Sequence, residues 1–146
     1  MRKKVVFVEL TIYERVFPLI SGYLQAFACK DPAIAREYEF EQFTTSVKSP
    51  VDDILPRLLR AAGDVYAFSC YVWNMALVRR LVAGLQAARP HARILLGGPQ
   101  VMHQAVRYLS PENENLLIAN GEGEHTFAGL LAEDFPARAT CRGSTG

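Results

Sequence analysis

Five short apolar runs alternate with amphipathic stretches along this chain, and that alternation constrains the fold more than any other feature. The expected strands are residues 5–9, 37–43, 65–69, 93–96 and 116–119. Between and after them, large apolar side chains recur at spacings of three and four residues, which indicates helices. Regular alternation of strand and helix predicts a parallel sheet with helices on both of its faces.

The side-chain pattern of two runs predicts the order of the strands. Residues 37–43 alternate glutamates with aromatic residues, as in an edge strand with one wet face. Residues 65–69 are apolar on both faces, which is typical of an internal strand. The order 2-1-3-4-5 satisfies both conditions, whereas 3-2-1-4-5 would put the third strand at an edge. We therefore predict an α/β fold with a doubly wound, flavodoxin-like (Rossmann-like) parallel sheet of five strands. Its ligand should lie beyond the carboxyl ends of the strands, at the switch point between strands one and three.

Size and composition bound the class of protein. The 146 residues suffice for one domain with a full hydrophobic core. The formal net charge of +1 gives no global field, so we expect neither nucleic acid nor a membrane as a partner. No apolar run approaches the roughly 18 residues of a membrane span, and residues 5–8 are too few for a signal peptide. We therefore expect a cytoplasmic protein.

Charge is segregated along the second half of the chain. Residues 65–111 contain five arginines and no acid, whereas residues 108–137 contain six acids and neither lysine nor arginine. A polarised docking surface would have this pattern. Ordinary solvated helix faces account for it more simply.

The three cysteines, Cys29, Cys70 and Cys141, are too widely spaced to form a disulfide framework. The chain has no C-x-x-C and no C-x-x-x-C-x-x-C motif, so it cannot by itself ligate an iron–sulfur cluster or a cysteine-rich zinc site. We expect these thiols to be buried or half-buried.

Several common families with this fold are excluded by the residues at the strand ends. A response-regulator receiver needs an aspartate after strand three, where this chain has Ser69. A flavodoxin needs a hydroxyl-rich phosphate loop after strand one, where residues 10–13 contain a single threonine. The G-x-G-x-x-G fingerprint is absent after strand one, and G-x-S-x-G and G-x-x-x-x-G-K-[ST] are absent altogether.

Four loops at the predicted ligand edge supply the candidate binding residues. Glycines there would let a ligand approach the backbone closely, although a glycine after a strand also serves as a plain turn. The loop after strand three carries a tyrosine and the only tryptophan. The alternative to a binding role for this tryptophan is that it packs under a neighbouring helix. The candidates are Leu10, Thr11, Tyr13, Ser69, Cys70, Tyr71, Val72, Trp73, Asn74, Gly97, Gly98, Pro99, Gln100, Val101, Asn120, Gly121, Glu122, Gly123 and Glu124.

Taken together in this order, segments 68–74, 95–101 and 120–127 resemble the N-terminal B12-binding domain of cobalamin-dependent radical SAM enzymes. The resemblance covers roughly residues 1–135. It implies a fold that binds cobalamin over the carboxyl edge, with the loops from Ser69, Gly97 and Gly121 cradling the corrin and its nucleotide tail. The implied function is that of a cobalamin-binding module, which positions the corrin for a methyltransferase-type or related catalytic domain absent from this chain.

The chain departs from that family in two respects. Many B12 domains carry D-x-H-x-x-G after strand one, whose histidine binds cobalt, but residues 9–15 hold no histidine. We therefore expect no protein ligand to the cobalt, and instead a Tyr71 or Trp73 ring, by preference Trp73, below the corrin. The cysteine motif of the radical SAM domain is also missing, so S-adenosylmethionine and the 4Fe-4S cluster would belong to a catalytic domain in cis. Residues 136–146 are then a linker or the truncated start of that domain, and the isolated module is not expected to be catalytic.

The sequence also allows a function of a different class, protein interaction without a cofactor. A flavodoxin-like protein-interaction domain without a cofactor could use the same apolar rim to dock a partner. Under the cofactor reading, a Cβ at Gly98 is expected to clash with the bound ligand and to leave the fold intact.

Overall fold

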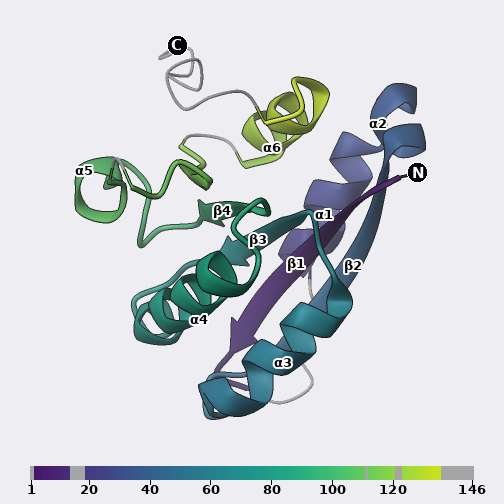
Figure 1. Cartoon of the computed structure of the whole chain (residues 1–146). Coiled ribbons are helices and arrows are strands. Elements are labelled where there is room, and N and C mark those ends of the chain that lie inside the picture. The colour runs from purple at the N-terminus through teal and green to yellow at the C-terminus, as the bar shows by residue number, and fades with distance from the viewer. Residues whose placement is uncertain (1, 14–18, 111, 121–122, 136–146) are drawn as a thin grey trace.

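The computed structural model describes residues 2–13, 19–110, 112–120 and 123–135, which form a five-stranded parallel sheet with helices on both faces (Figure 1). The strands are β1 (Lys3–Thr11), β2 (Tyr38–Ser46), β3 (Val65–Ser69), β4 (Arg93–Gly97) and β5 (Leu116–Ile118). The helices are α1 (Leu19–Ala28), α2 (Pro32–Glu37), α3 (Val51–Ala61), α4 (Met75–Ala88), α5 (Ala105–Tyr108) and α6 (Gly123–Ala132). None of the helices in these ranges has the length and apolar character needed to cross a membrane.

The strand order β2-β1-β3-β4-β5 confirms the flavodoxin-like prediction. β1 pairs with β2 along its whole length and with β3 on its other side, so it lies inside the sheet. β3 lies between β1 and β4, as its two apolar faces require. β2 is an edge strand, and its Glu39 is exposed.

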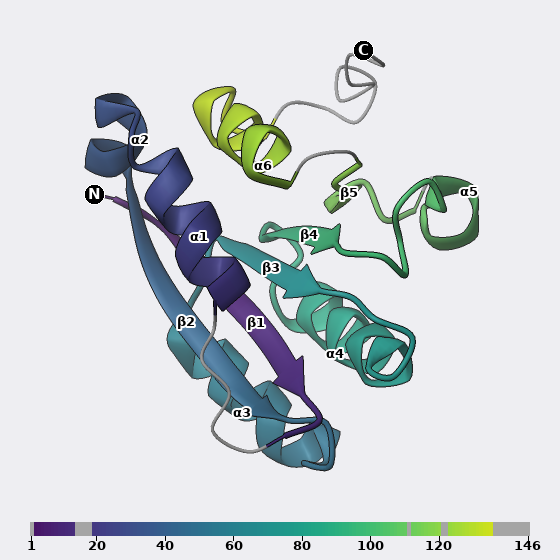
Figure 2. The same cartoon turned by 180° about the vertical axis from the view of Figure 1, so that it is seen from behind.

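Alternate side chains of β1 divide between two hydrophobic cores. Val6 and Val8 pack on the side of α3 and α4, and both are fully buried. Val5 and Phe7 pack on the opposite side, with residues of α1, α2 and α6. Figure 2 shows α1 and α6 lying together over that second face. The period of two along the strand therefore decides which layer each side chain joins.

Several elements differ in length from their predicted extents. β1 and β2 each run to nine residues, because they pair with each other to their ends. The helix α2 was not expected; the Asp31 side chain caps it by accepting a hydrogen bond from Ala33 N at 2.9 Å, with Pro32 at its start. Between β4 and β5, where the spacing indicated a helix, the only helix among the described residues is the four-residue α5. The expected linker at 136–146 and Cys141 lie outside the described residues.

Polar contacts attach the end of α6 to the start of the sheet. The Tyr38 hydroxyl donates to the carbonyl of Leu131 at 3.1 Å, and Asp134 forms an ion pair with Lys3. The hydrogen bond from Lys3 lowers the pKa of Asp134, while burial raises the pKa of Tyr38. Because Lys3 and Tyr38 begin their strands, this attachment lies at the amino edge of the sheet.

Candidate functional site

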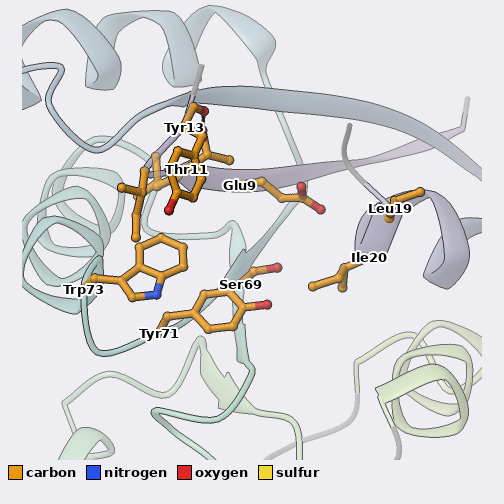
Figure 3. A pocket seen from close by; sticks show the side chains of 10 residues that line it. Glu9, Thr11, Tyr13, Leu19, Ile20, Ser69, Tyr71 and Trp73 are labelled. Atoms are coloured by element: carbon orange, nitrogen blue, oxygen red, sulfur yellow. Dashed lines mark hydrogen bonds between the residues drawn. The ribbon is translucent and has the colours of Figure 1, made fainter. Parts of the chain in front are cut away.

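The carboxyl ends of β1 and β3 open into a cavity of about 420 Å³, called here the mouth cavity (Figure 3). It is lined by Glu9, Leu10, Thr11, Ile12, Tyr13, Leu19, Ile20, Ser69, Tyr71 and Trp73. These residues come from the end of β1, the start of α1 and the loop after β3. The cavity therefore lies at the predicted switch point.

Two stacked aromatic rings form one wall of the mouth cavity. The ring centroids of Tyr71 and Trp73 are 4.7 Å apart and their planes differ by 5°. Trp73 remains 43% exposed, so the stack is not a core contact that is closed on all sides. The result is a broad, flat apolar surface beside the cavity, suited to a planar ligand.

The side chain of Asn74 holds this aromatic wall in place. Its Oδ1 accepts from Tyr71 N at 2.8 Å, and its Nδ2 donates to the carbonyls of Ser69 at 2.9 Å and Leu10 at 3.4 Å. Asn74 is only 1% exposed, so these bonds lie in a dry environment. One buried amide thus ties the β3 loop to the end of β1.

A second cavity of about 260 Å³, the inner cavity, lies between the sheet and the helices α1 and α6. It shares Ile20, Ser69 and Tyr71 with the mouth cavity, so the two adjoin at these residues. Its lining is Phe7, Ile20, Ser21, Leu24, Ala67, Phe68, Ser69, Tyr71, Leu95, Gly97, Gly98, Pro99, Ala119, Gly123, Glu124 and Phe127. A larger cavity at the edge of the sheet therefore adjoins a smaller, mainly apolar one.

The two glycines that end β4 have different roles. A Cβ built on Gly97 would lie 3.9 Å from the nearest atom, Ala119 Cβ, which is an ordinary van der Waals contact, so the protein itself leaves room for a side chain there. A Cβ on Gly98 would lie 2.6 Å from the backbone oxygen of Cys70, and Gly98 has a φ of +104°. The expectation that a side chain at Gly98 would leave the fold intact is therefore wrong, because the backbone itself requires glycine there.

Burial shifts two ionisable groups of the β3 loop. It raises the pKa of the Cys70 thiol to about 12, so this thiol stays protonated and unreactive near neutral pH. Burial also raises the pKa of the Tyr71 hydroxyl, and the nearby carboxylate of Glu9 adds to that increase. Both groups are neutral hydrogen-bonding partners under ordinary conditions.

The structure brings most of the predicted site residues to the two cavities. Those in the lining are Leu10, Thr11, Tyr13, Ser69, Tyr71, Trp73, Gly97, Gly98, Pro99, Gly123 and Glu124. Among the described residues, Cys70, Val72, Asn74, Gln100, Val101 and Asn120 are in neither lining. Cys70 and Val101 are fully buried on the α4 side. Gly121 and Glu122 lie outside the described residues.

Sequence reasoning missed Glu9 and the apolar residues of α1 that face it. Glu9 follows Val5 and Phe7 at intervals of two, so strand alternation would have placed it on the cavity side of β1. Leu19 and Ile20 gave no comparable signal, since a helix packed against a sheet normally turns such residues inward. None of the three histidines, all of which the structure describes, lines either cavity.

Comparisons with known proteins agree with this geometry. The cobalamin-dependent radical SAM methyltransferase TokK of Streptomyces tokunonensis is 32% identical over 130 residues, which are 89% of this chain and 18% of that protein. The 2-(S-pantetheinyl)-carbapenam-3-carboxylate methyltransferase of Streptantibioticus cattleyicolor is 30% identical over 135 residues, covering 90% of this chain and 19% of that protein. This chain thus spans about a fifth of the length of these curated relatives.

The fold is also found in a solved structure. The cobalamin-dependent S-adenosylmethionine radical enzyme OxsB, with aqua-cobalamin and S-adenosylmethionine bound, superimposes with a TM-score of 0.69 at 19% identity. The match covers 92% of this chain and 19% of that one. Residues 32–131 match the B12 binding domain family, which is more than half of the chain. On that match, this chain belongs to the B12-binding domain family.

Proposed function

We propose that this chain is the cobalamin-binding module of a B12-dependent radical SAM enzyme of methyltransferase type. The observation that carries the proposal is that the mouth cavity adjoins the inner cavity at the carboxyl edge, in a chain of the B12-binding family. The relatives' names supply the methyltransferase class. The proposal includes a cytoplasmic location, with which the free thiols of Cys29 and Cys70 agree because that compartment is reducing.

The residues present suit the cofactor in shape and in chemistry. Cobalamin combines a flat corrin ring with a narrower nucleotide tail. The larger mouth cavity lies beside the aromatic wall, and the smaller inner cavity adjoins it. Gly97 lines the inner cavity and carries no side chain, so a ligand there could approach its backbone closely. Tyr71 and Trp73 would hold the ring, and the glycine-lined inner cavity would hold the tail.

Bound cobalamin supplies a cobalt centre able to carry and release a methyl group. The chain's own residues bind it, orient it and limit the access of water. Asn74 keeps the aromatic wall attached to both strands, so this surface is formed before any ligand arrives. No side chain of the described cavity lining is a histidine, which supports a cobalt without an imidazole from the protein.

A catalytic domain in cis is the proposed partner. Large apolar side chains surround the mouth: Tyr13 is 72% exposed, Leu19 77% and Val72 78%. Such a rim is unusual around an opening that faces only water, and it would be covered by a domain closing over the corrin. The charge segregation noted in the sequence is compatible with the same contact.

The direct test is the absorption spectrum of the protein after mixing with hydroxocobalamin and desalting. Corrin bands at about one corrin per chain are expected, because the preformed cavity needs no second domain to exist. A Gly129→Val variant should retain the same amount of corrin as wild type, since a Cβ at Gly129 meets nothing within 4 Å. Colourless wild-type protein would instead favour the interaction domain without a cofactor.

If the Trp73 ring covers one face of the bound corrin, removing its indole should open that face to water. In wild type, electron paramagnetic resonance of bound cob(II)alamin is expected to lack nitrogen superhyperfine splitting. In Trp73→Ala, a water signature should become detectable and the affinity for hydroxocobalamin should fall by about tenfold, in line with the loss of one stacking ring.

Tyr23→Ala is the control for this prediction, because Tyr23 is 61% exposed and lies in the lining of neither cavity. Nitrogen splitting in wild type would refute the empty lower face, and an unchanged Trp73→Ala spectrum would make Trp73 a packing residue.

A further inference from the structure

Glu9 is a buried carboxylate that the proposed function leaves unexplained. It lies near the end of β1, is 8% exposed, and lines the mouth cavity. Carboxylates are seldom buried to this extent, because burying a charge is costly unless it is paired or hydrogen-bonded. An apolar or amide side chain at this position would avoid that cost.

A structural role explains only one of its two oxygens. Glu9 Oε1 accepts a hydrogen bond from the backbone N–H of Ser21 at 3.0 Å. Ser21 is the third residue of α1, so this N–H is one of those that the helix cannot satisfy internally. A neutral glutamine could make the same contact through its carbonyl oxygen. The tie to α1 therefore does not account for the negative charge.

The other oxygen, Oε2, accepts no hydrogen bond from any residue that the structure describes, and Glu9 forms no ion pair with them. Figure 3 shows the carboxylate on the same side as the hydroxyls of Ser69 and Tyr71, all three directed toward Ile20. Ser69, Tyr71 and Ile20 are the residues at which the two cavities adjoin. The charge is thus aimed at ligand space close to the junction.

The chemistry of such a group selects its partner. A carboxylate only accepts hydrogen bonds, so it attracts N–H or O–H donors and repels other anions. The rim of a corrin ring carries primary amides, whose N–H groups are donors, while incompletely amidated corrinoids carry carboxylates there instead. We propose that Glu9 accepts a hydrogen bond from a peripheral amide of the corrin ring, and thereby selects fully amidated corrinoids against those with a carboxylate at that position. This inference rests on the proposed function.

The test measures dissociation constants by absorbance titration, with no catalytic readout. The probes are hydroxocobalamin and its monocarboxylic acid derivatives, each with one peripheral amide hydrolysed. Against wild type, one derivative should bind at least about 30-fold more weakly than hydroxocobalamin, because it places two buried anions together. In Glu9→Gln, that derivative should bind within about threefold of hydroxocobalamin, since an amide can donate to the new carboxylate. Glu39→Gln, on the exposed edge strand, should retain the wild-type discrimination.

The outcomes distinguish a failure of this inference from a failure of the proposed function. If every derivative binds wild type as tightly as hydroxocobalamin, or if the penalty persists in Glu9→Gln, Glu9 does not select amides. Should Glu9→Gln fail to fold, the derivative series on wild type can still overturn the inference, because equal binding of every derivative would leave no discrimination for Glu9 to explain. If hydroxocobalamin itself does not bind wild type, the proposed function fails and this inference fails with it.

Discussion

The Gly97→Val variant is expected to lose about 100-fold in affinity for hydroxocobalamin, the effect of overfilling a cavity of fixed size. The backbone at Gly97 tolerates a side chain, since a Cβ there has no neighbour closer than 3.9 Å. A branched residue also suits the end of a strand. Its methyl groups would occupy the inner cavity, so binding should fail while the thermal unfolding midpoint stays within a few degrees of wild type.

A graded series makes this prediction sharper. Gly97→Ala should lower affinity less than Gly97→Val, because it fills less of the inner cavity. Gly129→Val supplies the same substitution on the exposed surface of α6, where binding should not change. Full affinity in a folded Gly97→Val protein would show that the ligand does not use the inner cavity.

The Gly98→Val variant should lose stability, and this is the second large effect. Its φ of +104° is strained for any residue with a side chain, and its Cβ would overlap the backbone of Cys70. We expect the free energy of unfolding to fall by about 3 kcal/mol, measured by urea denaturation in the absence of ligand. Lost binding would then follow from a disturbed β3 loop.

The pair of glycines provides its own internal control. Gly97→Val should separate binding from stability, whereas Gly98→Val should change both together. A Gly98→Val protein as stable as wild type would contradict the turn geometry of that loop. It would also restore the first expectation for Gly98, that a side chain there clashes with the ligand and leaves the fold intact.

The fold could be predicted because the place of a strand in the sheet determines which of its side chains are apolar and which are polar. The apolar run of β3 required an internal strand, and the glutamates of β2 required an edge, which together determined the order. The helix α2 was missed because six residues are too few to show a helical period. Its signal was local instead, in the capping Asp31 and the following Pro32.

The site could be predicted at the level of loops, but not at the level of individual side chains. Glycines and polar residues after strands identified the ligand edge. In the irregular loop after β3, however, no period tells which way a side chain turns. Trp73 lines the mouth cavity, while its neighbour Asn74 turns inward to bind three backbone groups. That division follows from hydrogen-bond geometry, which only the folded backbone defines.

The attachment of the end of α6 to Lys3 and Tyr38 sets a distance between the end of the described chain and the mouth cavity. Phe135, which is 3% exposed, packs at the amino edge of the sheet, while the mouth cavity opens at the carboxyl edge. The nine residues of β1 separate these edges by roughly 30 Å at about 3.3 Å per residue. If a catalytic domain is joined in cis after Phe135, as proposed, its connection would need at least about nine extended residues to reach the mouth cavity. Under that proposal, the length of the connection matters more than its composition, because a shorter one would hold the catalytic domain away from the mouth cavity.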